Sequence, residues 1–358
     1  MKQSINLKGV KLVCLMPSYN KAKTISKAIQ SVLMQKADFE FKLIVIDDCS
    51  SDESYAKAQE LAKANADKII LLKNQSNLGQ LHSMNGVYPL LQGVEYFCVL
   101  DPDDWYIYDK KFADALAFLD SHKDYTSYLT NCIVHKNGDE SLWYGGEKQI
   151  LDFDWNDYLN GNAIIAHTSG GIYRNVYFYE KMHQKFLEFT QKDYGGAFSA
   201  DGFRGPWHLK AGKAHFVNNT ESVYNYNYEG EWSSMSCYEQ NLHYANLHYA
   251  FSEFFSKDRE HFLQIAKRVF DETLCDLRAA DEEHILKNKA LILSCFERIY
   301  LNPHLKTIKE EKDLQDLPNL PDYKVRILGL PCLKITQTQQ NAKVKLFGKI
   351  ELLKIAKI

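Results

Sequence analysis

Short apolar runs alternate with longer segments of helical periodicity through the first hundred residues of the chain. The short runs are rich in β-branched residues, which predicts buried strands at residues 10–16, 41–46, 68–72 and 95–100. The longer segments repeat apolar residues on one face, which predicts helices at residues 24–35, 51–64 and 79–91. Strands and helices that alternate through short links indicate an α/β fold with a mostly parallel central sheet.

The pattern becomes mixed in the middle of the chain. Strand-like runs at residues 127–134 and 164–173 flank an insertion rich in Trp and Tyr near Trp155. Residues 237–301 show helical periodicity and predict a C-terminal helical region. Three prolines among charged residues then indicate a linker at residues 302–322.

The last segment, residues 323–358, interleaves basic with apolar residues. It contains eight Lys or Arg residues and a single acid, Glu351. We expect a basic amphipathic tail that binds an anionic membrane surface, because apolar burial and attraction to anionic lipids both favour binding there. The alternative is a final helix or hairpin that packs on the protein itself.

Composition places the chain among ordinary globular proteins. It has 358 residues, of which 45% are apolar and 25% are charged, and its formal net charge is −3. This charge argues against a nucleic-acid partner. Eight cysteines without a C-x-x-C pair predict neither a zinc site nor a disulfide framework, and they favour the cytoplasm. No apolar run reaches the length of a membrane span or resembles a secretory signal.

Polar motifs follow three of the predicted strands, at the point where each strand ends. They are PSYN at residues 17–20, DDCSSD at residues 47–52 and DPDD at residues 101–104. Ligands of open α/β sheets bind at the carboxyl ends of the strands. We therefore expect these polar side chains to surround one cleft.

The DPDD motif crowds Asp101, Asp103 and Asp104 behind an apolar strand. Like charges at this spacing raise one another's pKa and destabilise the fold unless something positive offsets them. A divalent cation held by one or two carboxylates and by substrate phosphates would do so, and hard oxygen ligands favour Mg²⁺ or Mn²⁺. The alternative is a polar turn in which Asp side chains cap the backbone.

Four segments, taken in order, resemble inverting family 2 glycosyltransferases with the Rossmann-like GT-A fold. They read LMPSYNKAKTISKAIQSVLMQ, LIVIDDCSSDES, NQSNLGQLHSMNG and VEYFCVLDPDDWY. The resemblance is close over residues 10–108 and weaker up to residue 236. It implies a GT-A domain over residues 1–236, with a nucleotide-binding half at 1–108 and an acceptor half at 109–236.

The resemblance also implies roles for individual residues in binding the nucleotide sugar. The residues that match the family's donor site are Pro17, Tyr19, Asn20, Asp48, Gly79, Asp101, Asp103 and Asp104. Among them, Asp48 matches the acid that bonds the uracil ring. Asp101 and Asp103 match the D-x-D motif, in which the last acid binds the metal. Lys21 departs from the pattern, since many relatives carry Glu there.

An acceptor hydroxyl must lose its proton as it attacks the anomeric carbon, and a positioned carboxylate can accept that proton. Asp201, in the segment FSADGFRGPWHLKAGKAHFV, matches the family's base. The alternatives are that Asp201 caps a helix, or that His167 or His208 is the base. Two aromatic residues, Tyr173 and Trp232, match acceptor-side segments, with core packing as the equal alternative for both.

The sequence thus predicts a metal-dependent inverting glycosyltransferase that uses Mn²⁺ or Mg²⁺. Its expected donor is a nucleotide-diphosphate sugar with UDP as the nucleotide, and its expected acceptor is a glycan or lipid-linked saccharide. The resemblance points to bacterial lipopolysaccharide, lipooligosaccharide or capsule synthesis on the inner face of the cytoplasmic membrane. A catalytically inactive GT-A binding module and a sugar nucleotidyltransferase are the alternatives.

Overall fold

The structure is a computed structural model of the chain. It describes residues 5–176, 200–226, 232–279 and 282–301, and four C-terminal strands between residues 324 and 356. The chain divides into two compact units. The first contains Met1–Gln191 and Ser199–Ser233, and the second contains Lys192–Phe198 and Ser234–Ile358.

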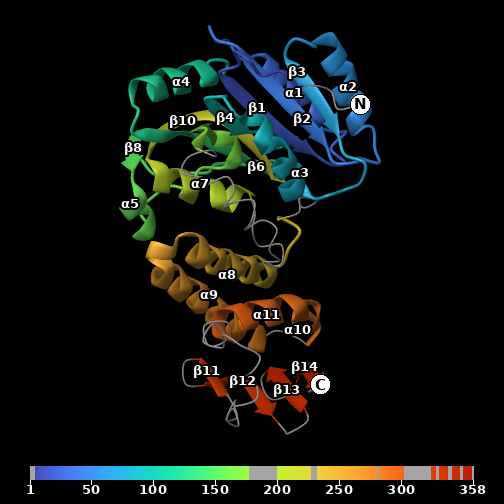
Figure 1. The fold of residues 1–358 in the computed structure, drawn as a ribbon, viewed down its shortest axis with the longest axis vertical. Coiled ribbons are helices and arrows are strands. Elements are labelled where there is room, and N and C mark those ends of the chain that lie inside the picture. The colour runs from blue at the N-terminus through green and yellow to red at the C-terminus, as the bar shows by residue number, and fades with distance from the viewer. Residues whose placement is uncertain are drawn as a thin grey trace. The chain divides into compact units, whose positions relative to one another are not determined.

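The first unit begins with four parallel strands in the order β3-β2-β1-β4 (Figure 1). Their bounds are β1 Leu12–Ser18, β2 Phe41–Asp47, β3 Ile69–Lys73 and β4 Tyr96–Val99. The connecting helices are α1 Ile25–Leu33, α2 Ser54–Ala64 and α3 Gln80–Val87, the last followed by the 3-10 turn η1 Tyr88–Leu91. The four predicted strands are confirmed to within two residues at each end.

Strand β1 is buried along its whole length because β2 and β4 flank it and side chains cover both of its faces. One face of the sheet, including Cys14 and Cys98, packs on α1 and on α4 Lys111–Ser121. Successive strand residues point to opposite faces, so Phe97 faces the other side. There it meets Tyr88 of η1 and His208 of α7.

The sheet continues beyond β4 with changes of direction. β9 Gly171–Arg174 runs antiparallel to both β4 and β6 Tyr125–Lys136, and β10 Lys213–Tyr226 runs parallel to β6. The structure also describes the short strands β5 Trp105–Tyr106, β7 Asp139–Leu142 and β8 Ile150–Phe153 and the helices α5 Trp155–Leu159 and α7 Ala200–Ala211. The result is a mixed α/β fold whose N-terminal half is parallel, as the sequence predicts.

The strand predicted at residues 164–173 is wrong over most of its length. The chain there forms a loop and the 3-10 turn η2 Thr168–Gly170, and only β9 is extended and paired. His167 caps this turn, since its ring nitrogen Nδ1 accepts a hydrogen bond from the Ser169 N–H at 3.3 Å. At Gly170 a Cβ atom would lie 2.5 Å from the Thr130 carbonyl oxygen, so the turn approaches β6 closely.

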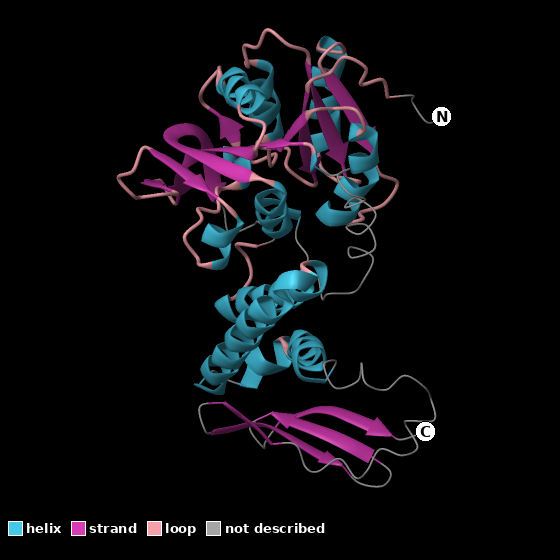
Figure 2. Ribbon diagram, turned by 60° about the vertical axis from the view of Figure 1, so that its left-hand side comes forward, coloured by secondary structure: helices cyan, strands magenta, loops and turns pink. Residues whose placement is uncertain are grey.

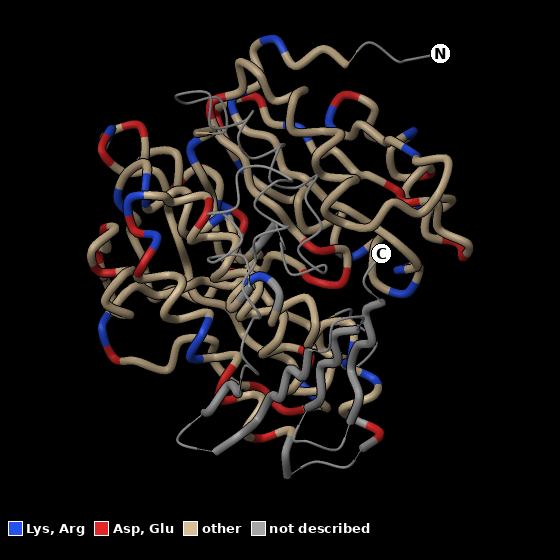
Figure 3. Tube along the Cα trace, turned by 60° about the horizontal axis from the view of Figure 1, so that its bottom comes forward, with Lys and Arg blue, Asp and Glu red and all other residues tan. Residues whose placement is uncertain are grey.

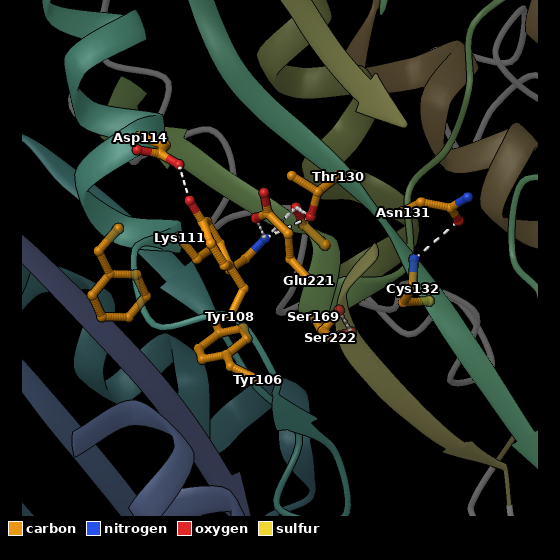
Figure 4. Close-up of polar contacts among 12 residues, drawn as sticks. Tyr106, Tyr108, Lys111, Asp114, Thr130, Asn131, Cys132, Ser169, Glu221 and Ser222 are labelled. Atoms are coloured by element: carbon orange, nitrogen blue, oxygen red, sulfur yellow. Dashed lines mark hydrogen bonds and ion pairs between the residues drawn. The ribbon is translucent and has the colours of Figure 1, made fainter. Parts of the chain in front are cut away.

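An ion pair inside the first unit joins α4 to β10. The Lys111 ammonium lies 3.3 Å from the Glu221 carboxylate, and the two side chains are 0% and 3% exposed. Lys111 also donates to Thr130 Oγ1 at 2.7 Å and to the Gly170 carbonyl at 3.1 Å. Figure 4 shows Lys111, Thr130 and Glu221 converging between these elements. The ammonium is therefore satisfied by three acceptors from three different segments.

The second unit begins with helices, as predicted for residues 237–301. They are α8 Cys237–Phe254, the 3-10 turn η4 Ser256–Asp258, α9 Arg259–Ala279, α10 Glu282–Lys287, α11 Lys289–Phe296 and the π-helical turn η5 Glu297–Leu301. Ser236 and Glu239 form a capping box at the start of α8, which satisfies two of its N-terminal N–H groups. The side chains of Phe251, Phe262 and Phe270 are fully buried among these helices.

The basic tail forms strands rather than a helix. β11 Lys324–Ile327, β12 Leu330–Gln337, β13 Asn341–Leu346 and β14 Ile350–Ala356 pair antiparallel in sequence order (Figure 2). The predicted linker at residues 302–322 lies outside the described residues. Among the helices that the structure describes, none has the length and hydropathy needed to cross a bilayer. Membrane contact by the tail stays a prediction.

Candidate functional site

The carboxyl ends of β1, β2 and β4 meet at one edge of the sheet. β1 lies between the other two strands, with Ser18 opposite Asp47 of β2 and Leu15 opposite Val99 of β4. The three polar motifs that follow these strands are therefore brought together, as the sequence predicts. Acidic and basic positions are interspersed along the chain trace (Figure 3).

The loop after β1 is tied to the loop after β2. Pro17 is buried within β1, whereas the Tyr19 side chain is 44% exposed. Asn20 has a positive φ of 51°, and its side-chain oxygen accepts hydrogen bonds from the Ser51 N–H at 2.9 Å and the Ser51 hydroxyl at 3.2 Å. Of the PSYN residues, Pro17 and Ser18 are thus buried, whereas Tyr19 and Asn20 are exposed.

Asp48 is buried, and the chain's own donors surround its carboxylate. The side-chain amide of Asn74 donates to Oδ1 at 2.7 Å, the Leu78 N–H donates to Oδ1 at 3.0 Å, and the Gly79 N–H donates to Oδ2 at 2.8 Å. Burial alone would raise the pKa of Asp48, but these hydrogen bonds outweigh it and lower the pKa. Asp48 therefore fixes the loop that leads to Gly79 and α3.

Asp101, Asp103 and Asp104, called the acidic cluster below, lie in the loop between β4 and β5. Asp104 is 1% exposed, and its carboxylate accepts a hydrogen bond from the Asn225 N–H at 3.0 Å. Burial first, and then the charges of Asp101 and Asp103, hold the pKa of Asp104 well above its usual range. The charged form of Asp104 is therefore disfavoured relative to an exposed carboxylate.

The other two acids of the cluster have polar partners from distant segments. The Lys21 ammonium lies 2.5 Å from Asp103 Oδ2, with side chains 24% and 16% exposed. The Gln80 side-chain amide donates to Asp101 Oδ1 at 3.1 Å. The positive group that the crowded acids require is thus supplied by the chain itself. The sequence marks Lys21 only as a departure from the family pattern, and nothing in it reveals this pairing.

An aromatic group lies beside Asp104. The His167 ring nitrogen Nδ1 is 3.6 Å from Asp104 Oδ2, and the His167 ring stacks on Tyr224 with 4.0 Å between centroids. Trp143 meets the same His167 ring edge-on at 5.3 Å and is 43% exposed. The sequence reasoning missed Trp143 and Tyr224, because only the strand pairing of β6, β7 and β10 brings them to the acidic cluster.

The predicted acceptor-side residues differ in their surroundings. Tyr173 is 4% exposed and packs on Phe97 and His208, so its position fits the core-packing alternative. Trp232 is exposed. His208 is buried, with its two ring nitrogens against the carbonyl oxygens of Arg204 and Arg174 at 2.7 and 3.0 Å, which indicates a structural role. Asp201 is the second residue of α7, and its side chain lies outside the described set.

A protein-family model matches residues 13–182, a stretch that contains the acidic cluster, Asp48 and Gly79. The description of that model is Glycosyl transferase family 2. Residues 13–182 belong to this family. The resemblance read from the four sequence motifs is thereby confirmed.

Curated relatives of the family 2 domain include proteins of Bacillus subtilis and Staphylococcus aureus. EpsE of Bacillus subtilis is 29% identical over 126 residues, which are 35% of this chain and 44% of EpsE. The poly(ribitol-phosphate) beta-N-acetylglucosaminyltransferase TarS of Staphylococcus aureus is 31% identical over 197 residues, 52% of this chain and 32% of TarS. The chain therefore spans less than half the length of both curated relatives.

Solved structures show that the fold is GT-A. The structure of S. aureus TarS 1-349 in complex with UDP matches with a TM-score of 0.56 and 16% identity, over 94% of this chain and 97% of that one. The structure of GalNAc-T7 with UDP, GalNAc and Mn²⁺ matches with a TM-score of 0.50 and 12% identity, over 95% and 65%. At these identities the matches establish the shared fold.

The acidic cluster fits a divalent cation only together with phosphate ligands. Among the described residues, no group of three or more His, Cys, Asp or Glu side chains is arranged to hold a metal ion. Asp101 and Asp103 can supply carboxylate oxygens, whereas Asp104 is buried. Mg²⁺ is commonly bound by one or two carboxylates plus substrate phosphates. The Asp101 and Asp103 carboxylates match in type and number the protein ligands of such a site.

Proposed function

We propose that the chain is an inverting glycosyltransferase that moves a sugar from a nucleotide-diphosphate donor to a saccharide or lipid-linked acceptor. The observation that carries this proposal is the convergence of two acidic motifs at one sheet edge inside a family 2 domain. One motif is the loop that Asp48 fixes, and the other is the acidic cluster. Ligands of parallel α/β sheets bind at this edge.

The donor we propose is a UDP-sugar. The solved structures of TarS and GalNAc-T7 both contain UDP, which supports this choice of nucleotide. Pro17, Tyr19, Asn20, Asp48 and Gly79 would line the nucleotide, with Tyr19 as the exposed aromatic surface. The Asp48 carboxylate accepts hydrogen bonds from the Leu78 and Gly79 N–H groups. Its role would therefore be to position the loop before α3 next to the nucleobase, as well as to contact the uracil ring.

Asp103, with Asp101 beside it, would hold Mn²⁺ or Mg²⁺ against the diphosphate. A bound divalent cation supplies Lewis-acid stabilisation of the negative charge that develops on the leaving diphosphate. The Mn²⁺ in the GalNAc-T7 structure supports this cofactor class. Asp104 is buried, and its raised pKa disfavours a third negative charge in the cluster.

Asp201 would be the general base. The bond between the acceptor oxygen and the anomeric carbon forms as the bond from that carbon to the diphosphate oxygen breaks. The acceptor hydroxyl proton passes to the Asp201 carboxylate, and the nucleoside diphosphate leaves with the electron pair. A single displacement from the face opposite the leaving group inverts the anomeric configuration.

The acceptor we propose belongs to a bacterial surface polysaccharide, with synthesis at the inner face of the cytoplasmic membrane. The printed name of TarS, a transferase acting on poly(ribitol-phosphate), supports a cell-envelope polymer. Trp232 is an exposed candidate for contact with the acceptor sugar, and Trp143 lies beside the acidic cluster. The basic tail, residues 323–358, would supply the peripheral membrane contact.

A donor screen that measures released UDP tests the activity. With Mn²⁺ and a panel of UDP-sugars, the wild type should hydrolyse or transfer at least one donor. Asp103→Asn should reduce kcat by roughly 10²-fold or more, because the cation loses its carboxylate ligand. The control is Asp67→Asn, which also removes one negative charge but at an exposed residue outside the site. This variant should keep the wild-type rate. Equal rates for wild type and Asp103→Asn would favour an inactive binding module.

A second variant tests the base. Asp201→Asn should lose on the order of 10²–10⁴ in kcat while UDP affinity, measured by calorimetry, stays unchanged. His167→Gln is the matched comparison, because His167 is the rival base nearest the acidic cluster. If Asp201→Asn keeps the wild-type rate and His167→Gln is slow, His167 rather than Asp201 accepts the proton of the acceptor hydroxyl.

A further inference from the structure

Lys21 provides a positive charge at the point where the family 2 domain would bind its metal. Its ammonium lies 2.5 Å from Asp103 Oδ2, and the two residues are 82 positions apart in the sequence. Both side chains are partly buried, at 24% and 16% exposure. An ion pair that is partly shielded from water is stronger than the average surface pair.

Hydrogen bonds fix the backbone at Lys21, and this fixed backbone positions the Lys21 side chain toward Asp103. The Lys21 N–H donates to Ser54 Oγ at 2.6 Å, and the next N–H, of Ala22, donates to Asp52 Oδ2 at 3.0 Å. The Lys21 carbonyl accepts hydrogen bonds from the N–H groups of Thr24 and Ile25. These contacts anchor the residue between the starts of α1 and α2.

The ammonium and a divalent cation would compete for the same carboxylate. A free cation that binds Asp103 must displace the ammonium and leave it beside the incoming positive charge, which is unfavourable. A cation that arrives on a diphosphate brings phosphate oxygens, and these can accept charge-assisted hydrogen bonds from the released ammonium. Replacement of the Lys21 ammonium by a divalent cation at Asp103 is therefore favourable when the nucleotide is present and unfavourable when it is absent.

We propose that Lys21 is an internal counter-ion of the D-x-D carboxylates and restricts metal binding to the metal–nucleotide complex. This inference rests on the proposed function, because it assumes that Asp103 is a metal ligand. It assigns to Lys21 a positioning role in the order of ligand binding. The role follows from the Lys21–Asp103 ion pair and not from the family resemblance.

Titration of Mn²⁺ by electron paramagnetic resonance, which measures the free ion, tests the proposal without any turnover. Without nucleotide, Lys21→Met should bind Mn²⁺ on the order of tenfold more tightly than the wild type, since the competing charge is gone. With UDP present, the two proteins should differ much less. Lys23→Met, an exposed lysine two positions along, changes the same net charge and should match the wild type throughout.

Two further variants keep the result interpretable. Lys21→Gln should reproduce the gain of Lys21→Met if removal of the charge, rather than a change in packing, is its cause. Lys21→Met combined with Asp103→Asn should lose the gain. If Lys21→Met binds free Mn²⁺ no better than the wild type while the wild type binds it with UDP, the inference is overturned and the proposed function stands. A gain that survives Asp103→Asn also overturns it.

Discussion

Two lysine–carboxylate pairs within the first unit show how differently one chain can use the same chemistry. Lys111 and Glu221 are buried, at 0% and 3% exposure, and Lys111 has two further acceptors in Thr130 and the Gly170 carbonyl. Lys21 and Asp103 are partly exposed, at a sheet edge that is lined with further acids. The first pair is complete without a ligand, whereas the second lies where a ligand can replace one partner.

The comparison teaches that surroundings, rather than the pair itself, decide between a structural and an exchangeable contact. Removal of one partner from a buried pair leaves an uncompensated charge in a medium that cannot solvate it. Removal of one partner at the sheet edge leaves a charge that water reaches. Stability should therefore depend strongly on Lys111 and weakly on Lys21.

The largest effect on stability is expected for Lys111→Met. The variant leaves the Glu221 carboxylate buried without its cation and should lose about 3–5 kcal/mol in the free energy of unfolding. Urea denaturation followed by circular dichroism measures the change. Combining Lys111→Met with Glu221→Leu removes both charges and should recover much of the loss. A single-variant loss below about 1 kcal/mol would show that the pair is not isolated from water.

An intermediate effect is expected for Asp48→Ala, which removes the acceptor for the Leu78 and Gly79 N–H groups. Hydrogen bonds to a charged acceptor contribute about 1.5–3 kcal/mol, so a loss of that order in the free energy of unfolding is expected near pH 7. The folded state lowers the pKa of Asp48 below its unfolded value of about 4. Its stabilisation is therefore present above pH 4 and is lost as pH falls through the folded pKa.

Denaturation of wild type and Asp48→Ala across a pH series checks this sign. The difference in the free energy of unfolding should be largest near neutral pH and should narrow below pH 4. Asp67→Ala is the matched control, because Asp67 is exposed and should show little difference at any pH. A gap between wild type and Asp48→Ala that widens in acid would contradict the assignment of Asp48 as a hydrogen-bonded carboxylate.

The smallest effect on stability is expected for Lys21→Met. Because both partners of this pair are partly exposed, the free energy of unfolding should change by less than about 1 kcal/mol. The same urea experiment measures it beside Lys111→Met. A loss as large as that of Lys111→Met would mean that the edge pair is structural, and it would remove the contrast between the two pairs.

Local patterns in the sequence were enough to predict the strands and helices of the N-terminal half and the edge where the polar motifs meet. Each predicted strand there is short and apolar, and the motifs come directly after the strand ends. The strand prediction at residues 164–173 was wrong because the run contains the turn η2, where Gly170 approaches Thr130 closely. Gly170 and Thr130 are 40 residues apart in the sequence, so the local pattern of apolar residues does not reveal their contact.

The order of apolar and polar residues along this chain specified its parallel strands and placed Asp48 and the acidic cluster at their ends. Pairing in space decided which charge each acid meets: Lys21 comes from 82 residues away to Asp103, and Lys111 from 110 residues away to Glu221. Burial raises the pKa of Asp104, whereas hydrogen bonds from Asn74, Leu78 and Gly79 outweigh burial at Asp48 and lower its pKa. Electrostatic environment is a property of three-dimensional neighbours and solvent access, and neither is written in adjacent residues.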